Sequence, residues 1–377
     1  MSNANNKPRI ALFGVGSLGG DQSGEGIPVI ADLFSRLSEQ YDIVYYSFTR
    51  VRKDNIPTNI VVRQIIAMKF PWRLKYLILF FHALADHIQN RFTLLFSVSV
   101  YPSGLFSLVL GKLINRPVLV QLIASEATRI KDVSVQLVIP WRRFITKFVC
   151  KHADRLITVA DYQRTLAVTS LPTTRHIDVL PLRINVNDFV YRKRKIEYPV
   201  HFIQVGFYGI VKDQDTMFKA FAKVATQIDC HLTVVGYGFD NVKVNAMLTE
   251  LGVENKVTRV GFVPRAKLHE YYDRAHILLH TARFETGCAV IQEAMASGVA
   301  VCGTNVGILA DLGNQYANIV EPQSTDELAA EILRLVHDQH RYDSITRTAR
   351  DWIKQHDARY AYLNYLNFLD GISGRKK

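Results

Sequence analysis

Two glutamates, Glu285 and Glu293, stand eight residues apart in the stretch ETGCAVIQE. If this stretch is helical, their carboxylates are displaced by about 12 Å along the axis and about 80° around it. The carboxyl groups of a glycoside hydrolase lie about 5 to 9.5 Å apart across one bond, so a hydrolytic pair would be hard to build here. A long ligand fits the spacing better, with one end at the helix N-terminus, where free N–H groups and the helix dipole favour phosphate. The alternative is a capping carboxylate followed by an exposed helix glutamate.

The elements around these glutamates form a strand, helix, strand unit. The apolar run Ile277 to His280 predicts a buried strand, and residues 281–286 form the turn after it. Apolar residues then recur at helical spacing up to Gly298, a typical helix stop, and a second strand follows to Val301. The turn and the helix start carry Glu285, Thr286, Gly287 and Cys288.

Three further loops of the second half have a similar position. Strands are predicted near residues 201–205, 231–235 and 257–260, and a turn containing glycine or proline follows each of them. Because open α/β sheets bind ligands at the carboxyl ends of their strands, these loops and the ETGCAVIQE loop are expected to share one site. They supply Gly206, Gly209 and Lys212 from the first loop, Gly236 and Gly238 from the second, and Val263 from the third.

The first half of the chain also begins with a strand and a glycine loop. The apolar run 9–15 precedes Gly16, Gly19 and Gly20, which can bring backbone N–H groups close to a ligand. A nicotinamide dinucleotide site is disfavoured, because no helix follows these glycines directly and the next acidic residue is badly placed. Strand-like runs then alternate with helical segments, and Glu126 lies near the end of one such run. The alternation predicts a parallel sheet covered on both faces.

A length of 377 residues suggests two domains. The periodicity breaks near residues 183–199, where prolines and a run of charges are typical of a linker. We predict a Rossmann-like acceptor-binding domain at 1–182, a linker at 183–199, and a Rossmann-like ligand-binding domain at 200–355. A C-terminal helix and basic tail at 356–377 can cross back to the first domain. The predicted fold class is α/β, with two doubly wound domains facing a central cleft.

Composition excludes several classes of protein. No apolar run approaches the roughly 20 residues of a membrane span. The start lacks a signal peptide, and the four cysteines show no disulfide-like or CxxC pattern. We therefore expect a protein of the reducing cytoplasm. The 12 histidines show no HxxE or HExxH spacing, so no metal site is predicted.

The net charge of +12 is unevenly distributed, because residues 1–190 hold 23 basic and 13 acidic residues. Two helical stretches there, 71–91 and 140–155, are both basic and aromatic. Such faces can lie on an anionic membrane surface, which favours a peripheral position on the inner face of the membrane. An ordinary amphipathic helix with a solvated cationic side is the alternative. Nucleic acid is not an expected partner, because no nucleic-acid-binding motif accompanies the charge.

The second half resembles glycosyltransferase family 4, retaining enzymes of GT-B fold that use nucleotide sugars. The family's Gly-Arg, four residues, Lys pattern corresponds to Gly206, Phe207 and Lys212, and its GxG turn to residues 236–238. Its Glu, seven residues, Glu motif corresponds to Glu285 and Glu293, and the stretches EAMASG and VGILADL also match.

The resemblance implies a role for each of these residues. Lys212 would pair with the leaving diphosphate, the N–H groups of Thr286 to Cys288 would lie beside phosphate and sugar, and Glu285 would bind the sugar hydroxyls. Glu293 would accept from the ribose, and the loop around Val263 would hold the base. The glycines of the loop 16–20 would approach from the other domain on the acceptor side, where Glu126 is also a candidate. No cofactor and no protein nucleophile are required. The implied activity is transfer of a sugar to an acceptor hydroxyl of a glycan or lipid-linked glycan, in cell-surface polysaccharide or glycolipid synthesis.

Three departures from the family pattern limit this assignment. Phe207 replaces the arginine that binds phosphate, so we consider Arg183 or Arg283 as a substitute. Ile123 stands where the family has a histidine, and Ile308 where it has a second glycine. Two alternatives therefore remain, a non-catalytic GT-B subunit that binds a nucleotide or a partner, and a GT-B sugar-nucleotide epimerase.

Overall fold

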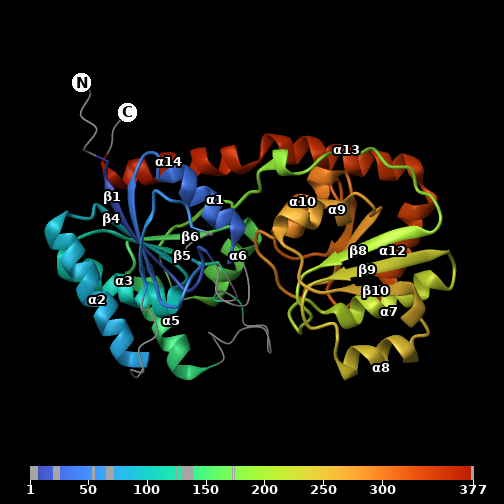
Figure 1. The fold of residues 1–377 in the computed structure, drawn as a ribbon, viewed down its shortest axis with the longest axis horizontal. Coiled ribbons are helices and arrows are strands. Elements are labelled where there is room, and N and C mark those ends of the chain that lie inside the picture. The colour runs from blue at the N-terminus through green and yellow to red at the C-terminus, as the bar shows by residue number, and fades with distance from the viewer. Residues whose placement is uncertain are drawn as a thin grey trace. The chain divides into compact units, whose positions relative to one another are not determined.

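The computed structural model describes residues 7–19, 26–52, 56–64, 72–123, 126, 128, 139–171, 173 and 175–374. The chain divides into two units, each built on its own parallel sheet (Figure 1). Unit 1 comprises Met1–Leu182 with Ala358–Lys377, and unit 2 comprises Arg183–Asp357.

Unit 1 contains a seven-stranded sheet of order β3-β2-β1-β4-β5-β6-β7. All neighbouring strands are parallel, and the central strands are almost entirely buried, as expected for a sheet covered on both faces. The order reverses between β1 and β4, and the loop carrying Gly16 and Gly19 follows β1. The strands are β1 (Arg9–Gly14), β2 (Asp42–Ser47), β3 (Val61–Gln64), β4 (Leu94–Val98), β5 (Val118–Gln121), β6 (Arg155–Thr158) and β7 (Ile177–Val179).

Helices cover both faces of this sheet, with α1 packed against α14 and α3 packed between α2 and α5 (Figure 1). A π-helical turn (η2, Val100–Gly104) precedes α3. The α-helices are α1 (Pro28–Leu37), α2 (Trp72–Gln89), α3 (Leu105–Ile114), α5 (Pro140–His152), α6 (Asp161–Ser170) and α14 (Ala358–Ser373).

The C-terminal helix α14 belongs to unit 1, which confirms the expectation that the chain end crosses back to the first domain. Buried Tyr365 ties the helix to the sheet, because its hydroxyl donates to the Leu180 carbonyl at 3.1 Å and accepts from Gln121 Nε2 at 2.9 Å. Asp370 accepts a further bond from the Tyr41 hydroxyl at 2.7 Å.

Unit 2 contains a six-stranded parallel sheet of order β10-β9-β8-β11-β12-β13. The order reverses between β8 and β11, and the crevice beside such a switch point is where open α/β sheets bind ligands. The loop with Lys212 follows β8, and the loop with Glu285 follows β11. The strands are β8 (Val200–Val205), β9 (Cys230–Val235), β10 (Val257–Val260), β11 (Ile277–His280), β12 (Ala300–Thr304) and β13 (Asn318–Val320).

The helices of unit 2 are distributed over both faces, with α7 and α12 in contact on one face and α10 and α13 on the other (Figure 1). Gly298 ends α10 in the left-handed conformation, as the sequence predicts. Within the segment 183–199, Arg194 donates to the carbonyls of Ser297 and Tyr272, the latter at 2.8 Å. The helices are α7 (Gln214–Ala225), α8 (Val242–Glu250), α9 (Arg265–Tyr272), α10 (Ala289–Ser297), α11 (Ile308–Leu312), α12 (Thr325–His337) and α13 (Gln339–Gln355), with two 3₁₀ turns, η4 (Val186–Asp188) and η5 (Glu254–Lys256).

The predicted doubly wound α/β fold is confirmed in both units. The predicted and observed strands agree, and among the described strands only the three-residue β7 was not predicted. Within the described residues, no helix combines the length and the hydropathy needed to cross a bilayer.

Candidate functional site

The loops after β8 and β9 interlock at the switch point of unit 2. The Gly206 N–H donates to the Val235 carbonyl at 2.9 Å, and the Tyr208 N–H donates to the Tyr237 carbonyl at 2.8 Å. A Cβ at Gly236 would lie 2.2 Å from the Gly206 carbonyl oxygen, and φ there is +141°. Gly238 has φ +88°. The GxG turn therefore needs glycine for the close approach of these two loops.

The backbone around Lys212 is fixed by hydrogen bonds to the loop after β11. The Thr281 hydroxyl, at the start of the loop after β11, faces the carbonyls of Lys212 and Asp213 at 3.1 and 2.9 Å. Asp213 adopts a left-handed conformation at the start of α7. The loops after β8 and β11 are thus joined, and the Lys212 ammonium forms an ion pair with Glu285 Oε2.

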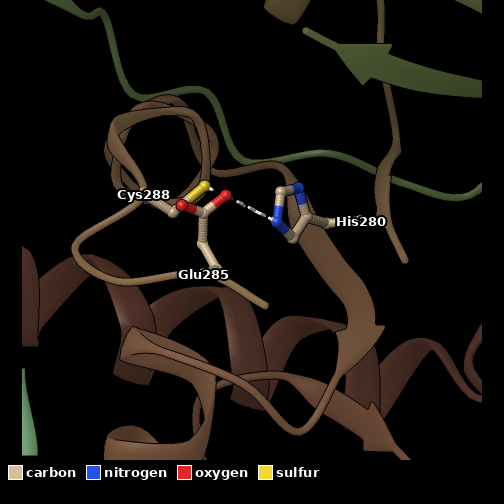
Figure 2. A group of neighbouring side chains, drawn as sticks. All are labelled: His280, Glu285 and Cys288. Carbon is tan, nitrogen blue, oxygen red and sulfur yellow. Dashed lines mark hydrogen bonds and ion pairs between the residues drawn. The ribbon is translucent and has the colours of Figure 1, made fainter. Parts of the chain in front are cut away.

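Glu285 lies in a small polar group with His280 and Cys288 (Figure 2). His280 Nε2 is 3.5 Å from Glu285 Oε2 and 3.7 Å from Cys288 Sγ. The Thr286 N–H donates to Glu285 Oε1 at 3.2 Å. Both carboxylate oxygens of Glu285 therefore have a partner, while 16% of its side chain stays exposed.

The pKa values in this group follow from burial and from the charge of Lys212. Burial would raise the pKa of Glu285, but the Lys212 charge and the His280 hydrogen bond outweigh it and hold this pKa far below its usual range. Burial opposes the charged form of Lys212 as well, yet the pairing with Glu285 raises its pKa. Burial lowers the pKa of His280 and raises that of the Cys288 thiol. At neutral pH the group is a Lys–Glu ion pair beside a neutral imidazole and a neutral thiol.

The same three side chains could in principle hold a metal, because one ligand atom from each lies within 4.8 Å of the others. The chemistry of the donor set opposes this. The Lys212 ammonium is bonded to the same Glu285 oxygen that faces His280, and it would repel a cation. A thiol must also lose its proton to ligate a metal, whereas burial favours the protonated form of Cys288. That no metal binds here therefore remains a prediction.

The loop of Thr286, Gly287 and Cys288 leads into α10. Cys288 is the residue before the helix, with φ 26° and ψ 93°, a conformation that costs a non-glycine residue free energy and is common at functional sites. The buried Gln292 side chain donates to the Gly287 carbonyl at 2.6 Å and fixes the loop from within the helix. The Ile308 N–H donates to the Thr286 carbonyl at 2.8 Å. The N–H groups at the start of α10 are thereby held in a defined position.

Glu293 lies deeper, with 3% of its residue surface exposed. Tyr272 donates its hydroxyl to Oε2 at 3.0 Å, and Arg265 donates to Oε1 at 3.3 Å. Burial raises the pKa of Glu293 despite the nearby Arg265 charge. Each carboxylate oxygen can accept a second hydrogen bond, so these contacts leave acceptor capacity for another hydroxyl.

Phe207 occupies the position where the family pattern has an arginine. Phe207 is 56% exposed and brings no charge to the loop. The Arg183 guanidinium lies 5.1 Å from the centre of the Trp352 ring, a cation–π contact within unit 2. Arg283 lies close enough to Asp213 to lower the pKa of that carboxyl, although burial raises this pKa overall.

An aromatic pair lies beside the predicted base-binding residue Val263. Tyr237 and Phe262 stack with their ring centroids 5.3 Å apart and their planes 4° apart. Both rings are substantially exposed, at 53% and 43%. They extend from the loops after β9 and β10, at the carboxyl edge of the sheet.

In unit 1 the predicted residues lie in separate surroundings. Gly16 and Gly19 both have positive φ, and a Cβ at Gly19 would lie 2.6 Å from Ile56 Cγ1. Gly20 lies outside the described residues. Glu126 is 2% exposed, and its charge adds to burial in raising the pKa of Cys150 to about 12.

Sequence reasoning missed three residues that contact the two glutamates. His280 ends β11 and belongs to an apolar run, so its type was the only signal. Arg265 and Tyr272 begin and end α9, and their seven-residue spacing places both on one helix face. That face could have been recognised only with knowledge that α9 packs against α10.

Comparison with known structures defines the class of the fold. Sucrose-phosphate synthase from Thermosynechococcus elongatus superimposes with a TM-score of 0.79 over 98% of this chain and all of that chain, at 16% identity. The Anabaena protein HepE in complex with UDP and glucose gives a TM-score of 0.77 over 97% of this chain and all of that chain, also at 16% identity. The chain therefore has the GT-B fold.

A family match is found in the sequence of unit 2. Residues 190–352 match the family model described as glycosyl transferases group 1, in agreement with the resemblance to family 4. N-acetyl-alpha-D-glucosaminyl L-malate synthase from Bacillus anthracis is 25% identical over 178 residues, which is 44% of this chain. The match spans 46% of that relative, or about half its length.

Proposed function

We propose that the chain is a retaining glycosyltransferase that moves a sugar from a nucleotide diphosphate donor to an acceptor hydroxyl. The observation that carries the proposal is the Lys212–Glu285 ion pair at the switch point of unit 2, next to the N-terminus of α10. A cation, free helix N–H groups and a sugar-binding carboxylate are the groups that a sugar diphosphate needs.

In the proposed reaction Lys212 changes partner. Without donor its charge is balanced by Glu285, and an arriving diphosphate competes for the same ammonium. Negative charge grows on the diphosphate as the bond between the sugar and the diphosphate breaks. Lys212 therefore stabilises the transition state more than the ground state. Glu285, released from Lys212 in part, accepts hydrogen bonds from the sugar hydroxyls. The acceptor hydroxyl attacks the sugar carbon from the side of the leaving diphosphate and gives its proton to the departing phosphate oxygen, so the new glycosidic bond retains the configuration without a protein nucleophile.

The remaining donor residues lie along the same edge of the sheet. Glu293 would accept from the ribose hydroxyls through its spare lone pairs, in addition to its bonds from Tyr272 and Arg265. Val263 would hold the base through its backbone, and the exposed Tyr237–Phe262 pair offers an aromatic surface beside it. Gly206, Gly236 and Gly238 would bring backbone close to the phosphates. Arg183 is proposed for the phosphate side in place of the family's arginine.

The acceptor is proposed to be a glycan or lipid-linked glycan that contacts unit 1 through the loop of Gly16, Gly19 and Gly20 and near Glu126. Helix α5 supports a membrane location for it. Trp141, Phe144 and Phe148 are 50%, 70% and 41% exposed and recur at helical spacing. Arg143, Lys147 and Lys151 form a basic line beside them, at intervals of four residues. An apolar line next to a cationic line suits the interface of an anionic leaflet.

The donor proposal is tested by thermal shift against a panel of nucleotide diphosphates and sugar nucleotides, starting with UDP and UDP-glucose. A ligand that binds only the folded state raises its melting temperature. Glu285→Ala should lower transfer about tenfold to a hundredfold, as expected for loss of a charged hydrogen-bond partner. Glu250→Ala, an exposed change in the same unit, is the matched control. Turnover of no sugar nucleotide by the wild type, with Glu285→Ala retaining the biological role, would favour a non-catalytic subunit. Interconversion of donors without acceptor would favour an epimerase.

The membrane proposal is tested with liposomes of anionic and neutral lipid at low salt. Charge reversal at Arg142 and Arg143 should weaken binding to anionic vesicles and lower turnover on a lipid-linked acceptor. If the wild type does not bind anionic vesicles and the charge-reversed variant keeps its turnover, the membrane proposal is wrong. The donor proposal does not depend on this result.

A further inference from the structure

A cavity of about 480 Å³ lies in unit 1, away from the loops that follow the strands. It is open to solvent and is bordered by the end of α2, the end of α3 and the residues that lead into β4 and β5. It therefore opens at the amino ends of these two parallel strands, opposite the edge where the loop of Gly16 and Gly19 lies. Its lining residues are His87, Ile88, Arg91, Ile114, Asn115 and Arg116.

The lining carries positive charge without a carboxylate. Arg91 and Arg116 both contribute guanidinium groups, and no aspartate or glutamate is among the lining residues. Among the described residues, neither arginine forms an ion pair, and Arg116 Nε is buried with no hydrogen-bond partner.

Neighbouring Arg9 occupies the C-terminal end of α2. Arg9 pairs with Asp42 at 2.9 Å, and its NH1 nitrogen donates to the Asp86 and Asn90 carbonyls, both at 2.8 Å. These carbonyls belong to the C-terminal end of α2, whose partial negative charge Arg9 therefore already satisfies. Arg91 and Arg116 remain available to a ligand.

His87 adds a donor of defined direction. Its Nδ1 accepts a hydrogen bond from the Phe92 N–H at 3.1 Å, so the neutral ring carries its proton on Nε2. Burial and the charges of Arg116, Arg91 and Arg9 lower the pKa of His87, which reports the positive field inside the cavity. Ile88 and Ile114 supply apolar walls, and Ile88 is 75% exposed.

We propose that this cavity binds a phosphate monoester through Arg91, Arg116 and His87. Two guanidinium groups and an imidazole N–H are the donors that bind phosphate oxygens well, and Arg can do so with two parallel bonds. A volume of about 480 Å³ holds more than the phosphate alone, so the ester carries a small organic group that contacts Ile88 and Ile114. A phosphorylated small molecule in solution and a phosphate-bearing lipid headgroup share this chemistry. The site is separate from the donor site of unit 2 and does not depend on the proposed transfer reaction.

The test measures binding of glycerol 3-phosphate to the full-length chain by calorimetry. The background is Lys212→Met, which weakens phosphate binding at the donor site and so separates the two sites. Arg91→Gln with Arg116→Gln should weaken binding by about tenfold or more, because charge-assisted bonds are lost. The matched control is Arg155→Gln, an exposed arginine of the same unit outside the cavity. In the absence of ligand, the double variant should keep the melting temperature of Lys212→Met alone.

Vesicles distinguish the source of the phosphate. Phosphatidic acid vesicles are compared with phosphatidylserine vesicles of equal charge, in wild type and in the double variant. Selective loss of binding to phosphatidic acid supports a lipid headgroup, whereas loss for glycerol 3-phosphate alone supports a soluble ester. Arg143→Gln with Lys147→Gln on α5 controls for general attraction to anionic lipid. Equal binding of both probes by wild type and Arg91→Gln/Arg116→Gln would overturn the proposal, and so would no binding by either form.

Discussion

Glu285 lies just before helix α10 and Glu293 lies in the middle of it, yet the surroundings of the two carboxylates differ. Glu285 precedes α10 and pairs with Lys212, which holds its pKa far below the usual range. Glu293 lies within α10, bonded to Tyr272 and Arg265, and burial raises its pKa. One carboxylate is stabilised as a charge, whereas the other is destabilised as a charge by the same protein interior.

The difference separates two tasks that one residue type can perform. In the proposed reaction the strongly ionised Glu285 accepts from the sugar hydroxyls, and its partner Lys212 is the cation that the diphosphate would use. Glu293 is buried, and its hydrogen bonds come from a neutral donor and a cationic donor. It therefore shapes the wall of the site and contributes little to the charge of the site. The opposite shifts of the two pKa values are therefore the property that variants of these residues can test.

The largest effect is expected from Lys212→Met, which leaves the Glu285 carboxylate largely buried without its cation. Breaking a buried pair from one side costs about 3 kcal/mol or more, and donor binding should be lost with it. Lys243→Met is the matched control, because Lys243 pairs with Asp215 at 2.7 Å but is 64% exposed. An exposed pair contributes at most about 1 kcal/mol. The two free energies of unfolding are compared by urea denaturation at pH 7.

Adding Glu285→Gln to Lys212→Met should restore part of the lost stability, because no uncompensated charge then remains. A Lys212→Met variant as stable as Lys243→Met would show that the ion pair does not control Glu285, and the comparison would fail.

The next effect is a difference in sign between Glu285→Gln and Glu293→Gln. The folded-state pKa of Glu285 is lowered, so its contribution to stability is present above the usual pKa of 4.5 and is lost as pH falls. The folded-state pKa of Glu293 is raised, so its contribution is present at low pH and is lost as pH rises through 4.5 and above. Glu285→Gln should cost about 1.5 to 3 kcal/mol at pH 7 and less at pH 4.

Glu293→Gln should show the opposite trend, with a cost that is larger at pH 4 than at pH 7. The measurement is the free energy of unfolding of each variant relative to wild type at several pH values. Parallel trends in the two variants would contradict the assigned surroundings of the two carboxylates. Unchanged donor affinity in Glu293→Gln would separately contradict the proposed ribose contact.

The sequence predicts the framework of this comparison but not its chemistry. Apolar runs such as Ile277 to His280 are long and bounded by turn residues, so the strands and the order of loops follow from pattern alone. The shared edge of parallel strands then brings Lys212 and Glu285 to one site. Whether two such side chains bond to each other depends on a few ångströms of loop position, which no spacing rule contains.

The partners of Glu293 were beyond prediction for a related reason. Arg265 and Tyr272 lie on α9, and only the packing of α9 against α10 makes them neighbours of that carboxylate. The helix α14 shows the same limit, because the sequence allowed its return to the first domain but could not identify the Tyr365 hydrogen bonds that fix it. The sequence pattern therefore predicts the helices and strands, whereas the pKa values of the glutamates depend on tertiary contacts.

A smaller effect is expected from His276→Asn, which removes a third titration that overlaps those of the glutamates. Burial, then the charges of His201 and Arg194, lower the pKa of His276 to about 4, against a usual value of 6.5, and Glu197 opposes them weakly. Because the folded state prefers the neutral ring, stability is full above pH 6.5 and is lost as pH falls toward 4. The loss should be about 1 to 2 kcal/mol, reduced because the ring is partly exposed.

In His276→Asn the free energy of unfolding should vary less between pH 6.5 and 4, while the asparagine oxygen can still accept the bond from the His201 N–H, 3.0 Å from Nδ1 in the wild type. His269→Asn, an exposed change in the same unit, is the control. An unchanged pH slope in His276→Asn would transfer the acid sensitivity to another group and would complicate the trend assigned to Glu285.

The smallest effect is expected from chelation, and it concerns the cause of the low Glu285 pKa. A cation bound by His280, Glu285 and Cys288 would lower that pKa by itself, and Lys212 would then be unnecessary. With Lys212 bonded to the same carboxylate oxygen and the Cys288 thiol protonated, EDTA should leave the melting temperature and donor affinity unchanged. Elemental analysis of the purified chain should give no stoichiometric zinc. A melting temperature that falls on chelation and returns with Zn²⁺ would assign the charge of Glu285 to a metal, and the contrast with Glu293 would become one of metal ligation rather than of ion pairing.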